Sequence, residues 1–225
     1  STIALNAAIT ASGTVDIDST GVTTIAAAGD ITAGGAVTFG AAKSGTLTTA
    51  GDVDTTDDNI TFTRAVTLTA AVDIDTVGGA AGNILFLSTI ATAGQDLALD
   101  AGTAGNITLS AALTGRGAMT VRDGAVQAYG ALTVGSLSIL DATTSVTFGG
   151  AVNASTTITV VSGGTIVQTG AVTAATTVNY DAGSTIALNA AITASGTVDI
   201  DSTGVTTIAA AGDITAGGAV TFGAA

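Results

Sequence analysis

The segment Ser184–Gly204 reads STIALNAAITASGTVDIDSTG, and its most regular stretch is TVDID at 197–201. In an extended strand successive side chains point to opposite faces, so Val198 and Ile200 share one face and the two aspartates share the other. Shorter apolar and polar alternations precede this stretch, separated by the Asn, Ser and Gly residues that favour turns. The segment therefore predicts three short strands joined by turns.

The segment begins the second copy of an exact repeat. Residues 1–42 and 184–225 are identical, at an offset of 183 residues. We interpret 1–183 as one long unit and 184–225 as the start of an identical second unit, within a single continuous domain, 1–225. A looser period of about 20 residues divides the long unit into nine pieces, which begin at Ser1, Val22, Thr46, Ala65, Asn83, Asn106, Ala125, Val146 and Thr165.

Stacking of these pieces decides the fold. One piece cannot bury its own apolar face, whereas stacked pieces bury a continuous core between parallel strands. We predict an all-β parallel β-helix (β-solenoid), with about 20 residues and three short strands per coil. A β-sandwich also has closely spaced strands but does not need a self-similar period. Nine coils predict a unit about 43 Å long, and eleven coils a rod of about 53 Å.

Stacking also predicts two interior ladders of like residues. The first contains Val15, Val37, Ile60, Val72, Leu97, Met119, Leu137, Ile158, Val178 and Val198. The second lies two residues further along each strand and contains Ile17, Phe39, Phe62, Ile74, Leu99, Val121, Ile139, Val160, Tyr180 and Ile200.

Composition excludes several classes of function. The chain has no Cys, His, Pro, Trp or Glu, so thiolate and imidazole metal sites and histidine-based catalysis are excluded. Four cations oppose 17 aspartates, which gives a net charge of −13 and disfavours nucleic acid as a partner. No run of about 18 apolar residues is present, so we expect no membrane insertion.

Several segments carry a family resemblance. NITLSAALTGRGAMTVRDG (106–124) and the phrases VTFGAA (37–42) and VTFGGA (146–151) resemble the haemagglutinin-type repeats of bacterial filamentous adhesins. The resemblance runs through essentially the whole chain. It implies a right-handed parallel β-helix and a secreted bacterial protein in an extracellular or cell-surface location. The exact 183-residue repeat and the few charges depart from that family, and they favour a structural fibre over receptor binding.

Paired aspartates at i and i+2 are the most regular polar feature. Within a strand both carboxylates of a pair face outward, and pairs on neighbouring coils or rods could bridge Ca²⁺, which prefers carboxylate oxygens. The alternative is a solvated acidic face that keeps fibres apart. The candidate ligands are Asp16, Asp18, Asp52, Asp54, Asp73, Asp75, Asp199 and Asp201. No other cofactor is expected.

Other patterns are weaker. Thr-x-Thr pairs are typical of ice-binding solenoids, but these fall at different places in the coil. Carboxylate pairs also serve glycoside hydrolysis, yet no Trp is present for sugar stacking, and we expect no enzyme. Asn59, Asn83, Asn106 and Asn153 are expected to cap corners through their side chains, and Asn59, Asn106 and Asn153 also match the glycosylation sequon.

Three functions remain open. The first is a repeat segment of an extracellular filament or giant fibre, continued covalently or by end-to-end stacking of copies of itself, with lateral bundling. The second is the stalk of an adhesin that presents a separate binding tip. The third is an amyloid-like matrix protein, which dense β-formers and few charges permit.

Overall fold

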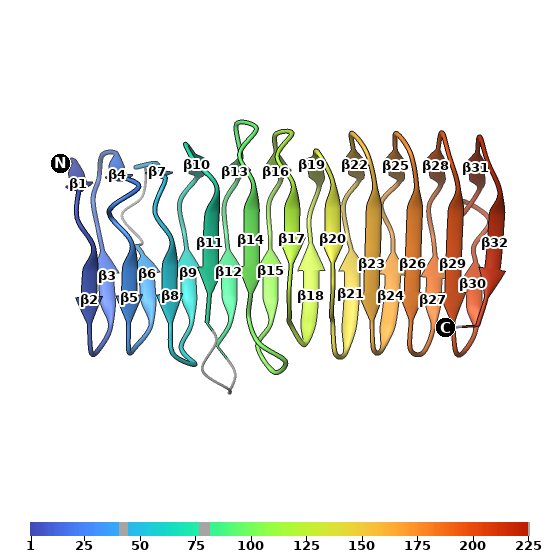
Figure 1. The fold of residues 1–225 in the computed structure, drawn as a ribbon, viewed down its shortest axis with the longest axis horizontal. Helices are drawn as coiled ribbons and strands as arrows, with labels where there is room; N and C mark the ends of the chain where they lie inside the picture. The colour runs from blue at the N-terminus through green and yellow to red at the C-terminus, as the bar shows by residue number, and fades with distance from the viewer. Residues whose placement is uncertain (41–44, 77–81, 225) are drawn as a thin grey trace.

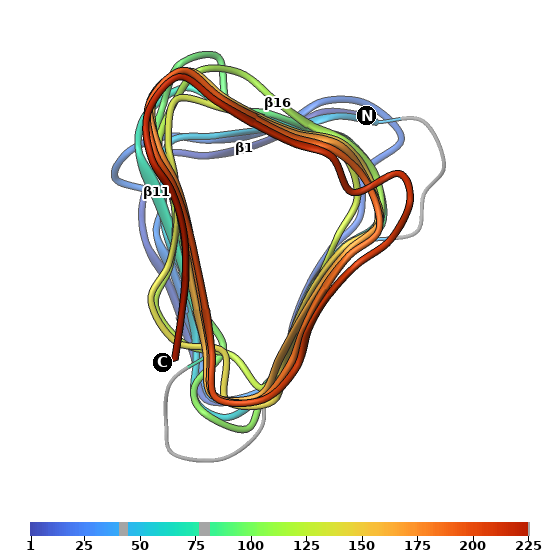
Figure 2. The same ribbon diagram turned by 90° about the vertical axis from the view of Figure 1, so that its right-hand side faces the viewer.

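The computed structural model describes residues 1–40, 45–76 and 82–224, and these fold into a β-solenoid of about eleven coils. The described residues contain 32 strands and no helix. Successive strands follow one another along a rod, with the two termini near opposite ends (Figure 1). Viewed along its axis the rod has a triangular outline, with one strand of each coil on each side (Figure 2). The predicted fold class, with three strands per coil, is confirmed.

Each side of the triangle is one parallel sheet, because every strand pairs with the strand three positions later. Sheet A contains β1 (Ile3–Leu5), β4 (Thr23–Ile25), β7 (Leu47–Thr49), β10 (Val66–Leu68), β13 (Ile90–Ala91), β16 (Leu113–Thr114), β19 (Leu132–Val134), β22 (Val152–Ala154), β25 (Val172–Ala174), β28 (Ile192–Ala194) and β31 (Ile214–Ala216). Sheet B contains β2 (Ile9–Ala11), β5 (Ile31–Ala33), β8 (Val53–Thr55), β11 (Val72–Asp75), β14 (Leu97–Asp100), β17 (Met119–Val121), β20 (Leu137–Ile139), β23 (Ile158–Ser162), β26 (Val178–Ala182), β29 (Val198–Ser202) and β32 (Val220–Gly223). Sheet C contains β3 (Val15–Ile17), β6 (Val37–Phe39), β9 (Ile60–Phe62), β12 (Ile84–Phe86), β15 (Ile107–Leu109), β18 (Val126–Tyr129), β21 (Ser145–Phe148), β24 (Thr165–Gln168), β27 (Ile186–Leu188) and β30 (Thr206–Ile208).

The two-residue alternation of the sequence sets which side chains enter the core. In β9, Ile60 and Phe62 are buried while Thr61 between them is partly exposed, and most strands away from the two ends repeat this pattern. β-Branched and aromatic residues suit such half-buried strands. Parallel pairing satisfies the backbone groups of each strand on both edges, which a chain without Pro permits at every position.

The predicted ladders are correct only in parts. Val15, Val37 and Ile60 pair in sheet C as expected, but Ile60 then pairs with Ile84 and not with Val72. Val72 belongs to sheet B, where it pairs with Leu97 and leads the rest of the predicted row. The second ladder breaks at the same place, because Phe62 pairs with Phe86 and not with Ile74.

Aromatic stacking marks the true register of sheet C. The rings of Phe39 and Phe62 stack with centroids 4.8 Å apart, and those of Phe62 and Phe86 with centroids 4.3 Å apart. All three side chains are at most 2% exposed. The stack continues the interior of three successive coils and favours this pairing over the predicted one.

Corners between sheets require close approach of successive coils. A Cβ atom on Gly164 would lie 1.8 Å from the carbonyl oxygen of Thr144, one coil earlier. At Gly117 a Cβ would lie 1.6 Å from the carbonyl oxygen of Gln95. Since backbone atoms cannot yield to such contacts, these two corners accept only glycine.

Candidate functional site

The most acidic surface lies on sheet B, where outward side chains of adjacent coils form two columns. In one column each carboxylate accepts a hydrogen bond from the backbone N–H of the aspartate one coil later. Asp52 N donates to Asp30 Oδ1 at 3.0 Å, and Asp73 N donates to Asp52 Oδ1 at 2.8 Å. The second column consists of register-paired residues on β8, β11 and β14. We call the six residues the acidic columns: Asp30, Asp52, Asp73, Asp54, Asp75 and Asp100.

Arg122 neutralises part of this surface. Its guanidinium forms a two-pronged ion pair with Asp73, with Nη1 to Oδ1 at 2.9 Å and Nη2 to Oδ2 at 2.6 Å. Arg122 follows β17, two coils beyond Asp73, and Ala98 is the partner of Asp73 on the intervening β14. These residues line a shallow depression of about 300 Å³, together with Asp52 and Asp96.

Crowding of carboxylates shifts their protonation. Burial, followed by the charges of Asp75, Asp52, Asp73 and Asp30, raises the pKa of Asp54 to about 6. Burial also raises the pKa of Asp100, although the backbone N–H of Gly102 donates to its carboxylate and opposes the shift. At pH 7 the carboxylate of Asp54 is therefore charged at a cost in free energy, and its protonation in mildly acidic solution removes that cost.

The structure brings together only some of the predicted calcium ligands. Asp52, Asp54, Asp73 and Asp75 share neighbouring coils of sheet B. Asp16 lies on β3 of sheet C, with Asp18 just after it, and both are exposed. Asp199 and Asp201 lie on β29, six strands along sheet B from β11. Over residues 1–40, 45–76 and 82–224, no three carboxylates converge as a metal site requires. Calcium bridging stays a prediction.

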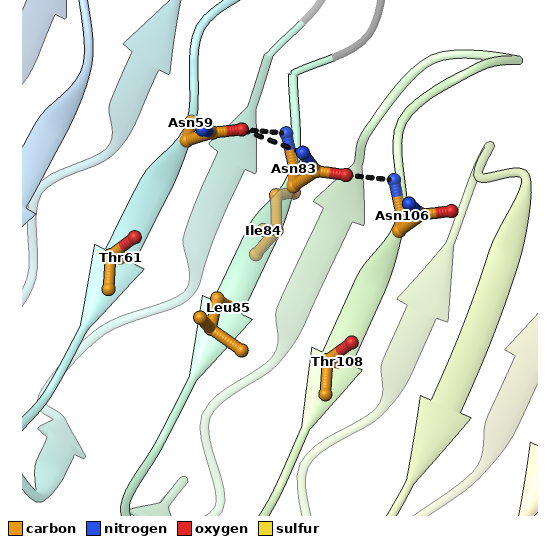
Figure 3. A pocket seen from close by; sticks show the side chains of 7 residues that line it. All are labelled: Asn59, Thr61, Asn83, Ile84, Leu85, Asn106 and Thr108. Atoms are coloured by element: carbon orange, nitrogen blue, oxygen red, sulfur yellow. Dashed lines mark hydrogen bonds between the residues drawn. The ribbon is translucent and has the colours of Figure 1, made fainter.

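Asparagines form a separate ladder at the start of three strands of sheet C (Figure 3). Asn59 Oδ1 accepts from both the backbone N–H and the side-chain amide of Asn83, at 2.9 and 2.8 Å, and Asn83 Oδ1 accepts from Asn106 N at 2.9 Å. Asn106 in turn accepts from the backbone of Val126. The predicted role at corners is thereby extended for these three, because each side chain bonds the next coil. For Asn153 the prediction is wrong, since it is the exposed middle residue of β22.

The ladder borders a shallow depression of about 340 Å³ on the outer face of sheet C. Outward side chains of β9, β12 and β15, namely Thr61, Leu85 and Thr108, lie along its length (Figure 3). The depression is open and its side chains carry no charge, so it offers amide and hydroxyl groups but no catalytic acid or base.

A buried arginine is the polar feature that the sequence did not reveal. Arg64 is 7% exposed, and its Nη1 donates to the hydroxyls of Ser19 and Thr23 at 3.3 and 3.2 Å. Its Nη2 donates to the carbonyls of Ser19 and Gly40, both at 3.1 Å. We call Ser19, Thr23 and Gly40 the arginine cage. Arg64 thus links its own corner by hydrogen bonds to Gly40, one coil earlier, and to Ser19, two coils earlier.

The two tyrosines are core residues. Tyr180, expected in the core, is fully buried on β26, and Tyr129 is 3% exposed on β18. The Tyr129 hydroxyl donates to Gln127 Oε1 at 2.7 Å, and the Gln127 side chain is itself fully buried inside the solenoid. Burial raises the pKa of both phenols, so both stay protonated.

Threonine pairs do not gather on one face. Thr48 and Thr67 are partners in sheet A, whereas Thr61 lies in sheet C and Thr159 in sheet B. The expectation that these pairs would be spread around the coil is therefore correct only in part, because the pairs that contain Thr48 and Thr67 meet on neighbouring coils of sheet A while the other two lie in sheets C and B.

The chain matches no protein-family model, and comparisons with curated proteins and with solved structures found no match. Among the described residues, no helix has the length and apolar character needed to span a membrane.

Proposed function

We propose that this chain is a structural repeat segment of an extracellular or cell-surface filament, as the haemagglutinin-like phrases first suggested. In such a fibre the solenoid supplies length and stiffness. Copies of the unit continue it covalently, by end-to-end stacking, or both.

A comparison of identical residues in the two copies carries this proposal. Val37 and Phe39 on β6 are fully buried because the next coil covers them. Their sequence equivalents on the last strand, Val220 and Phe222, are 41% and 52% exposed. The same side chains thus form either a core layer or an apolar end surface, depending on whether a further coil is present. Identical residues form a core layer wherever a coil is stacked on them, so the same coil geometry can be continued by repetition of the unit.

The outer wall fits a fibre better than an enzyme. Most outward positions carry Thr, Ser, Asn or Ala, and the depressions on sheets B and C are shallow. The net charge of −13 opposes lateral clumping of rods. An adhesin stalk would use the same rod, and a separate tip domain in the parent protein would distinguish it. An amyloid-like matrix would show seeded assembly with a lag.

Chains extended by whole 183-residue units test the proposal by small-angle scattering. The strand count of the structure gives eight and two-thirds coils per unit. At a spacing of about 4.8 Å per coil, each added unit should lengthen the rod by about 42 Å at constant cross-section. A growing cross-section at constant length contradicts a filament.

Self-association is tested on the present chain with Phe222→Asp, which places a charge on the end surface. Sedimentation velocity should show less end-to-end association than in the parent chain. Thr193→Asp adds the same charge to the exposed outer wall of β28 and should leave association unchanged. Equal behaviour of the two variants would exclude stacking through this end.

A further inference from the structure

Equivalent strands of the two identical copies lie on different sides of the solenoid. Ile3–Leu5 forms β1 in sheet A, whereas the same residues in the second copy, Ile186–Leu188, form β27 in sheet C. The following strands are displaced in the same way. β2 lies in sheet B and its copy β28 in sheet A, while β3 lies in sheet C and its copy β29 in sheet B.

The displacement arises because the long unit does not contain a whole number of coils. β27 comes 26 strands after β1 in the described chain, and three strands make one coil, so the unit spans eight and two-thirds coils. The predicted count of nine coils per unit is therefore wrong. The missing strand belongs to the piece 65–82, whose described residues form β10 and β11 only, whereas the other pieces contribute three strands each.

Local pairing decides this count independently of residues 77–81. β9 and β12 are partners in sheet C, with Thr61 opposite Leu85, and β8 and β11 are partners in sheet B. A unit of nine coils would instead have placed Ile60 beside Val72, and hence Thr61 beside Asp73. The aromatic stack from Phe62 to Phe86 excludes that arrangement.

We propose that, in a longer chain, each 183-residue unit is rotated about the solenoid axis relative to the unit before it, so that equivalent strands lie on neighbouring faces of the triangle. After three units, equivalent strands lie on the same face again. The three units contain 549 residues and 78 strands, or 26 coils, which gives a superperiod of about 125 Å at about 4.8 Å per coil. This inference rests on the proposed function, because it applies to a rod in which the unit continues.

The consequence concerns what a fibre presents to its surroundings. The acidic columns lie on one face within a unit, so successive units carry them on successive faces, about 120° apart. Each side of the rod then shows the same chemistry only once in every three units. A contact with a flat partner or a neighbouring rod therefore recurs along that side at intervals of about 125 Å. Continuous side-by-side association of two rods along one face is thereby prevented.

Cysteine cross-linking tests the phase in the present chain, which has no native thiol. In Thr61→Cys/Leu85→Cys the two cysteines are register partners on adjacent parallel strands, and a Cα–Cα separation of about 4.8 Å lies within the range for a disulfide. Mild oxidation followed by maleimide mass tagging should leave almost no free thiol. In Thr61→Cys/Asp73→Cys the thiols lie on different sheets, and both should remain free. The reverse pattern would overturn the inference.

Helical reconstruction of chains with three or more units tests the superperiod. The expected symmetry is a rise of about 42 Å and a rotation close to 120° per unit. A similar rise with a rotation near zero would overturn the superperiod while leaving the filament intact. Absence of rods would contradict the proposed function and with it the superperiod, and the cross-linking result would still decide the phase of the two copies in the present chain.

Discussion

The buried arginine allows a sharp prediction, because the exact repeat supplies its own control. Ser19 and Thr23 belong to the arginine cage, and their sequence equivalents are Ser202 and Thr206. In both copies the serine hydroxyl lies near the threonine hydroxyl, at 3.1 and 3.0 Å, and donates to a glycine carbonyl two residues on. Only Ser19 also accepts a hydrogen bond from an arginine.

The expected difference follows from that one bond. Ser19→Ala and Ser202→Ala each remove the same two neutral hydrogen bonds, worth about 0.5–1.5 kcal/mol each. Ser19→Ala also removes one of four acceptors from a buried guanidinium, and a hydrogen bond to a charged group contributes about 1.5–3 kcal/mol. Because the distance to Arg64 is 3.3 Å, we expect Ser19→Ala to cost about 1.5 kcal/mol more than Ser202→Ala.

Native-state hydrogen exchange measures this cost locally, which is necessary because solenoids do not unfold in one step. Matched amides are available. Ile3 N donates to Val22 O at 3.1 Å, and Ile186 N donates to Val205 O at 3.2 Å. The opening free energy at Ile3 should fall more in Ser19→Ala than that at Ile186 falls in Ser202→Ala.

A double-mutant cycle separates the arginine from the serine. In an Arg64→Met chain, Ser19→Ala should cost no more than Ser202→Ala does in the parent chain, because the charged donor is gone. Equal costs of the two alanine variants in the parent chain would refute the role assigned to Arg64. The role would also be refuted if Ser19→Ala cost the same free energy in the Arg64→Met chain as in the parent chain.

Three further predictions concern the core and the acidic columns. Phe62→Ala removes the middle ring of the buried stack and should lower the local free energy of opening by about 3–5 kcal/mol, while Phe222→Ala at the exposed end should cost less than half as much, as measured by native-state hydrogen exchange. The folded pKa of Asp54, about 6, lies above its ordinary 3.8, so the native state holds a proton that the unfolded chain releases; the contribution of Asp54 to stability should be fully present below pH 4 and be lost as pH rises through 6. Asp54→Asn should therefore raise the melting temperature at pH 7 and leave it unchanged at pH 3.5, and equal effects at both pH values would contradict this origin. Calcium bridging predicts that a chelator lowers the melting temperature of the parent chain but not of Asp75→Asn, and an unchanged parent melting curve rules the site out.

The sequence was sufficient to predict local structure and the fold class. Alternation in Val-Asp-Ile (198–200) dictates a strand with one apolar face, because the side-chain period of an extended backbone is two residues. Repetition every twenty residues then requires stacking, since such short strands have no other way to bury that face. The outward placement of Asp54 on β8 and of Asp73 and Asp75 on β11 follows from the same alternation.

The arginine cage could not be predicted in this way. Arg64 follows an ordinary strand, and nothing near it in the sequence distinguishes it from the exposed Arg116. Its partners, Ser19 and Thr23, are 45 and 41 residues away. Whether an arginine at a corner turns inward depends on the space left by the preceding coils, and only the folded chain defines that space.

Which strand stacks on which was likewise decided by tertiary structure. Every strand offers nearly the same apolar–polar–apolar triplet, so Ile60 has equally suitable partners in Val72 and Ile84 as far as local sequence is concerned. The choice depends on how the rings of Phe62 and Phe86 fill the interior and on how much chain each corner needs before the next face begins. For that reason the sequence alone determined that the protein is a solenoid, whereas the phase of its repeat, and therefore the face on which each identical residue lies, emerged only from packing between coils.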